Sequence, residues 1–186
     1  MIAPIPLAHG TIDGIGDIWN GILHPLREPA HLLVVLGLAL LAAQRSRITP
    51  PLIAFLGASA AGLAFTLIGP RLGFNRPPDY LPCSIAGMAG VGAAARLPLS
   101  RLAITALFAT GAFVIGWDSG QESTDPVALL KLLAGSWIGL AVMILNSANY
   151  ASNCPKKLWI KVGFRVLGSW VAACSILYLA FTFRRV

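Results

Sequence analysis

The sequence predicts an all-α, polytopic integral membrane protein folded as a bundle of six transmembrane helices. Of its 186 residues, 56% are hydrophobic and only 11% are charged, whereas soluble domains carry about 25% charged residues. Long apolar runs alternate with short segments that hold the charges and prolines. The three cysteines are too few for a secreted disulfide scaffold. We expect one transmembrane domain over residues 1–186, with no room for a soluble domain.

A membrane-spanning helix needs about 20 mainly apolar residues. The breaks predict spans at about 16–44, 51–69, 81–95, 99–117, 126–149 and 158–183. Residues 31–44 alone are too few for the first span, so its helix must begin near Gly16. The second span starts at Pro51, where the missing N–H costs nothing. The third is short and rich in glycine and alanine, including Gly90, as is typical of a closely packed central helix. Gly57 and Gly62 predict close packing for the second span as well.

The last three spans are bounded by other signals. Charged residues flank the fourth and the sixth. The fifth follows Thr124-Asp125-Pro126, an N-cap residue and then a first-turn proline.

The charges predict the orientation of these spans. Six basic residues lie in the first, third and fifth loops: Arg45, Arg47, Arg96, Arg101, Lys156 and Lys157. Four arginines lie on the other side, together with all seven acids and the three histidines. The odd loops are therefore expected to be cytoplasmic and both termini external, in a multi-pass protein of the bacterial inner membrane. The net charge of +7 is explained by topology, so the expected partner is the lipid bilayer and not nucleic acid.

A polar stripe on the first predicted helix is the candidate site. Residues advance about 100° per position on a helix, so Asp17, His24, Glu28 and His31 share one face if the helix is continuous. Two imidazoles and a carboxylate suit nickel, cobalt or zinc, which predicts a metal site at His24, Glu28 and His31 with Asp17 as a fourth group. If the helix begins only after Pro29, His24 and Glu28 lie in an interfacial loop. His31 would then cap or pack at the membrane surface.

The segment GDIWNGILHPL at 16–26, followed by AHLL at 30–33, resembles the opening of the HupE/UreJ family. The resemblance implies a six-helix membrane protein linked to hydrogenase or urease maturation, with nickel or cobalt as its transported substrate. The family's first helix carries H-P-x4-D-H. His24, Pro25 and His31 match this motif, Ala30 stands at the aspartate position, and Glu28 is a substitute on the same face. The chain has no histidine after residue 31, so the family's second histidine-rich motif is reduced to the polar residues Asn146, Ser147, Asn149 and Tyr150.

Two functions follow from these patterns. The first is uptake or handling of a divalent metal ion, and the second is a non-transporting membrane subunit that docks to or stabilises a larger complex. The apolar run from Val34 to Leu41 favours the second, because a permease needs polar groups along its path. Trp117-Asp118-Ser119-Gly120 is similar to a serine-hydrolase elbow but has no oxyanion loop. We therefore expect no catalytic residue, no enzyme activity and no cofactor apart from the metal as substrate.

Overall fold

The computed structural model describes residues 12, 14–45, 48–120, 125–154 and 157–184, and every regular element among them is helical. This confirms the all-α prediction for the described part of the chain. The elements are α1 (Asp17–Arg27), α2 (Pro29–Ala42), α3 (Thr49–Ile68), the 3-10 helix η1 (Gly69–Leu72), α4 (Tyr80–Ala95), α5 (Arg101–Asp118), α6 (Pro126–Asn153) and α7 (Leu158–Arg184).

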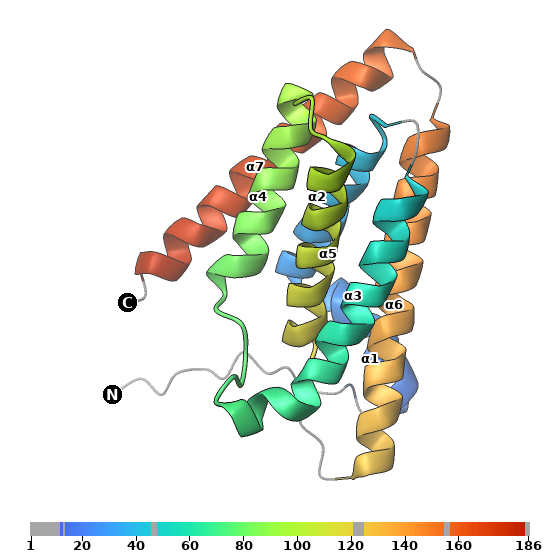
Figure 1. Cartoon of the computed structure of the whole chain (residues 1–186), viewed down its shortest axis with the longest axis vertical. Coiled ribbons are helices and arrows are strands. Elements are labelled where there is room, and N and C mark those ends of the chain that lie inside the picture. The colour runs from blue at the N-terminus through green and yellow to red at the C-terminus, as the bar shows by residue number, and fades with distance from the viewer. Residues whose placement is uncertain (1–11, 13, 46–47, 121–124, 155–156, 185–186) are drawn as a thin grey trace.

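Helices α2 to α7 run alternately between two ends of the bundle (Figure 1). We call the end where α5 finishes and α6 begins the acidic end, because the described acids lie in the segments on that side: Asp17, Glu28, Asp79, Asp118 and Asp125. The opposite end, where α3 and α5 begin, is the basic end. Asp13, Glu122, His9, Arg47 and Lys156 lie outside the described residues.

The predicted count of six membrane spans is not confirmed. Four helical segments, which contain α3, α5, α6 and α7, are long and apolar enough to cross a membrane, and α1 with α2 makes a fifth if the bent pair is one span. Helix α4 is apolar but has only 16 residues. At about 1.5 Å per residue, it falls short of a hydrocarbon core of about 30 Å. The described residues therefore support a membrane protein with four or five candidate spans.

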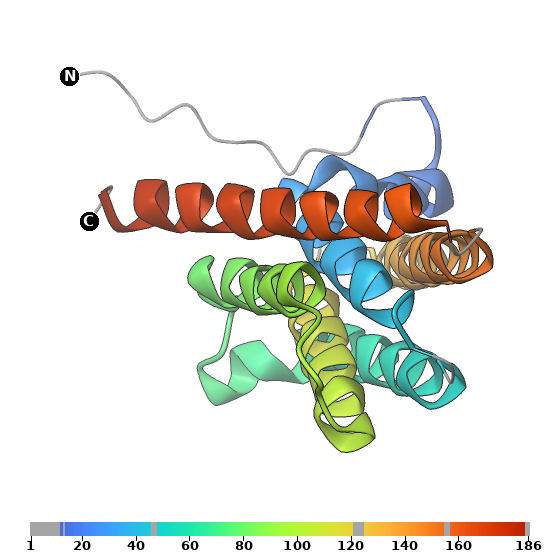
Figure 2. The ribbon, with the colours of Figure 1, turned by 90° about the horizontal axis from the view of Figure 1, so that it is seen from above.

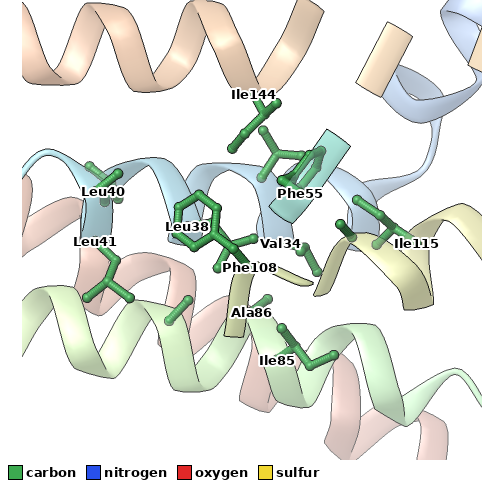
Figure 3. Close-up of a cluster of buried hydrophobic side chains, with 14 of the residues drawn as sticks. Val34, Leu38, Leu40, Leu41, Phe55, Ile85, Ala86, Phe108, Ile115 and Ile144 are labelled. Atoms are coloured by element: carbon green, nitrogen blue, oxygen red, sulfur yellow. The ribbon is translucent and has the colours of Figure 1, made fainter. Parts of the chain in front are cut away.

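Helix α2 forms the centre of the bundle, and Figure 2 shows it enclosed by other helices. Its residues Val34, Leu38 and Leu41 are fully buried. They pack in one apolar cluster with side chains of the surrounding helices, which Figure 3 draws: Phe55, Ile85, Ala86, Phe108, Ile115 and Ile144. A helix that is apolar on all sides is stable only when it is buried, which explains why this short helix lies inside the longer ones.

Three helix pairs approach closely through glycine. A Cβ on Gly90 of α4 would lie 2.8 Å from the backbone oxygen of Gly168 on α7, and one on Gly21 of α1 would lie 2.9 Å from the Cα of Gly135 on α6. Gly62 of α3 meets the backbone of α5 in the same way. The predicted close packing is confirmed at Gly90 and Gly62, but it is wrong at Gly57, where a Cβ would meet no atom within 4 Å.

Candidate functional site

The first predicted span is broken at Glu28, and this break shapes the site. Glu28 adopts an extended backbone with φ −93° and ψ 107°, and Pro29 begins α2. A residue before proline is disfavoured in the helical conformation, and proline suits the first helical position because it has no N–H to bond. The two helices consequently meet at a bend of 69°. The predicted continuous stripe is therefore wrong, because rotation angles do not carry across this break.

The bend brings two histidines together from different helices. His24 on α1 and His31 on α2 have ring centroids 5.7 Å apart in an edge-to-face arrangement. His24 is 7% exposed and His31 is fully buried. Two nitrogens that bind one ion lie within about 4 Å of each other, since each bond is about 2 Å long.

Asp118 is the site residue that the sequence analysis did not select. It ends α5 and places its Oδ2 atom 3.0 Å from Nε2 of His31. Its side chain is only 7% exposed. In the sequence, Asp118 could have been found only from its position at the end of a predicted span, on the same side of the membrane as the histidines. The contact itself depends on how α5 packs near the α1–α2 break.

Arg76 occupies the other oxygen of the same carboxylate. Its Nε donates to Oδ1 of Asp118 at 2.7 Å, from the segment between η1 and α4. The Arg76 side chain is 46% exposed, so the ion pair reaches the surface at the acidic end. Burial lowers the pKa of Arg76, but the hydrogen bond and charge of Asp118, followed by the charges of Asp79 and Glu28, raise it overall. Arg76 is therefore a permanent cation beside Asp118.

These contacts set the tautomer of His31. A carboxylate can only accept a hydrogen bond, so Nε2 of His31 carries the proton that it donates to Asp118. Nδ1 of His31 is buried and has no hydrogen-bond partner among the described residues. A proton there would be a buried donor with no acceptor, which costs about 1–3 kcal/mol. Nδ1 is therefore the nitrogen of His31 that is available to a ligand, and the His31 and His24 ring centroids are 5.7 Å apart.

The other two predicted ligands lie at the two ends of α1. Asp17 is the first residue of α1, and Glu28 lies in the break between the two helices. Within the described ranges, no three histidine, cysteine, aspartate or glutamate side chains are grouped closely enough to hold a metal ion as they stand. The metal site at His24, Glu28, His31 and Asp17 stays a prediction. Of these four, the two histidines are in ring contact.

A family model described as HupE / UreJ protein matches residues 1–178. The chain belongs to this family. Comparisons with curated proteins and with solved structures found no match. In this HupE/UreJ protein, Ala30 occupies the motif's aspartate position, while the carboxylate in contact with His31 comes from Asp118 on another helix. The family and the apolar helices together identify a membrane protein.

Proposed function

We propose that this HupE/UreJ protein takes up or handles a divalent transition metal ion, nickel or cobalt, and binds it between His24 and His31. The observation that carries the proposal is the buried Nδ1 atom of His31, which has no hydrogen-bond partner among the described residues, in a ring whose centroid lies 5.7 Å from that of His24. Metal-binding histidines commonly donate their other N–H to a carboxylate, which fixes the tautomer and raises the basicity of the ligating nitrogen. Asp118 is in position for that role.

The positive charge of Arg76 affects both Asp118 and an incoming metal ion. In the site without metal, Arg76 neutralises Asp118, so burial of the carboxylate costs less free energy. An incoming divalent ion adds positive charge near Arg76, and the two cations repel. We propose that the Arg76 side chain, which is half exposed, swings away when metal binds and frees Oδ1 of Asp118. The full negative charge of Asp118 would then act on His31 and raise the basicity of the nitrogen that binds the metal.

The proposed function includes an orientation of the bundle in the membrane. The acidic end, with His24 and His31, would face the external side of a bacterial inner membrane, and both termini would lie there. The loop charges support this orientation, because basic residues favour cytoplasmic loops. Acidic residues on the outer side would also raise the local concentration of cations.

The proposal is tested by calorimetric titration of nickel or cobalt chloride into the purified full chain at pH 7.5. His24→Ala and His31→Ala should each weaken binding at least about tenfold, the range expected for disruption of a metal site. Ser175→Ala is the control, because this buried serine is on α7 and bonds its own helix at Val171. Binding of the parent protein should also weaken at lower pH, since a protonated imidazole cannot ligate. Unchanged affinity in the double histidine variant would refute the proposed site.

A second candidate is a non-transporting membrane subunit that docks to a larger complex. It is favoured by the core of α2 beyond the histidines, where Val34, Leu38 and Leu41 are fully buried among apolar neighbours. Nickel uptake into vesicles that contain only this protein separates the two functions. Uptake that is lost in His31→Ala supports transport. Binding without uptake, together with co-purification of a membrane complex, supports the subunit.

A further inference from the structure

The basic end of the bundle contains a cavity that the metal site does not use. Its volume is about 210 Å³, and it lies among the end of α2, the start of α3 and the start of α5. Its polar lining includes Arg45, Arg101 and Thr105. Its apolar lining includes Ile48, Leu99 and Ile104. The cavity therefore combines two cations with an apolar wall.

The cations of this cavity have no carboxylate to neutralise them. Arg45 and Arg101 make no ion pair among the described residues, and the first turns of α3 and α5 contain no acid. Nη2 of Arg45 donates to the carbonyl oxygen of Leu97 at 2.6 Å. Its Nε atom is buried and has no hydrogen-bond partner in the described part of the chain. A buried donor without a partner is unfavourable, and two guanidinium groups in the lining favour an anionic ligand in the cavity.

The depth of the cavity indicates what kind of anion it takes. Two candidate membrane segments, Thr49–Leu72 and Arg101–Asp118, begin beside it, which is the level of lipid headgroups. Arginine recognises phosphate through several parallel N–H donors. Basic pockets between membrane helices bind anionic headgroups, and the apolar wall suits the adjoining glycerol and acyl chain. The N-terminal end of α5, which Ser100 caps, adds positive potential on the same side.

We infer that this cavity binds the phosphate group of an anionic phospholipid between Arg45 and Arg101, with the start of its acyl chain against Ile48 and Ile104. The site is independent of the metal proposal, because it lies at the opposite end of the bundle. Bound lipid would link α2, α3 and α5 at an end where no side-chain ion pair of the described residues joins them. The lipid would therefore stabilise the bundle as well as occupy the cavity.

The test is native mass spectrometry and thermal unfolding of the purified full chain in non-ionic detergent. Dioleoyl phosphatidylglycerol should bind and raise the melting temperature, whereas dioleoyl phosphatidylcholine should not. Arg45→Gln with Arg101→Gln should weaken phosphatidylglycerol binding at least tenfold. The matched control is Arg96→Gln with Lys161→Gln, which removes two exposed charges near the same end but outside the cavity lining. An equal loss of phosphatidylglycerol binding in the two double variants would refute a specific site.

Two further arms complete the test. Thr105→Phe fills the cavity while both arginines remain, so it should also weaken binding if the double arginine variant fails to fold. Unchanged binding in Thr105→Phe would overturn the assignment to this cavity. Inorganic phosphate is the soluble competitor: if millimolar phosphate displaces the lipid and alone raises the melting temperature equally, the site takes free phosphate and the lipid assignment is wrong. His31→Ala should leave lipid binding unchanged.

Discussion

Nε2 of His31 on α2 lies 3.0 Å from Oδ2 of Asp118, which ends α5 87 residues later in the chain. This one contact determines the state of the candidate site. It uses Nε2 as the donor, leaves Nδ1 without a hydrogen-bond partner among the described residues, and connects His31 to Arg76 through the second carboxylate oxygen. Substitutions of Asp118 and Arg76 therefore test the site.

Asp118→Asn should lower nickel affinity by about 10- to 100-fold, the range found for lost outer-shell carboxylates. Asparagine keeps an oxygen that can accept from His31 but carries no charge, so the imidazole is a weaker donor to the metal. Calorimetry at pH 7.5 measures the change. Asp79→Asn is the control, since Asp79 is an exposed residue at the same end and makes no side-chain cap to α4. An equal loss in the control would mean that only the overall charge matters.

Arg76→Gln should have the opposite effect and tighten nickel binding severalfold. The substitution removes a cation that repels the metal and that neutralises the charge of Asp118 beside His31. Arg71→Gln removes one charge from nearby η1 and should leave the affinity almost unchanged, because no hydrogen bond or ion pair of the described residues joins Arg71 to Asp118. Weaker binding in Arg76→Gln would show that the arginine holds the site together instead of competing with the ion.

Ala30→Asp should partly restore metal binding in an Asp118→Ala background. It completes the family motif H-P-x4-D-H and places a carboxylate in the first turn of α2, where the helix dipole stabilises negative charge. The double variant should therefore bind nickel more tightly than Asp118→Ala alone in the same titration. If it binds equally weakly, a carboxylate at position 30 cannot replace Asp118.

Gly90→Leu should destabilise the protein at the upper end of the usual overpacking cost of about 1–3 kcal/mol. Even a Cβ at Gly90 would lie 2.8 Å from the backbone of α7. Gly57→Leu adds the same side chain to α3 where nothing lies within 4 Å of a Cβ, so it should melt close to the parent. The melting temperatures of the two variants in the same detergent give the comparison. Similar melting temperatures would show that α4 does not pack tightly on α7.

Both termini are predicted to face the outside of the inner membrane, because six basic residues in the odd loops outnumber the four in the second loop and the C-terminal tail. A reporter that is active only outside the cytoplasm, fused after the last residue, should be active. The same reporter fused in the loop after residue 45 should be silent. The reverse pattern would invert the bundle and place the histidines at the cytoplasmic side.

The sequence by itself determined the class of the protein and the positions of its helices. Apolar runs, proline starts and charged breaks predicted α3, α5, α6 and α7 to within a few residues, because these signals act locally along the chain. The motif around His24 and His31 indicated the family that the match over residues 1–178 confirmed. The sequence also showed Pro29, but a rotation count along one helix could not give the size or direction of the bend.

Only the tertiary structure decided which side chains share the site. The 69° bend at Glu28 separates Asp17 and His24 from the helix of His31, so the predicted stripe does not exist as one face. Asp118 reaches His31 from the end of α5, and Arg76 reaches Asp118 from the loop before α4, both from segments far away in the chain. Such contacts have no periodicity in the sequence, because they depend on where separate helices end in space and not on spacing along one helix.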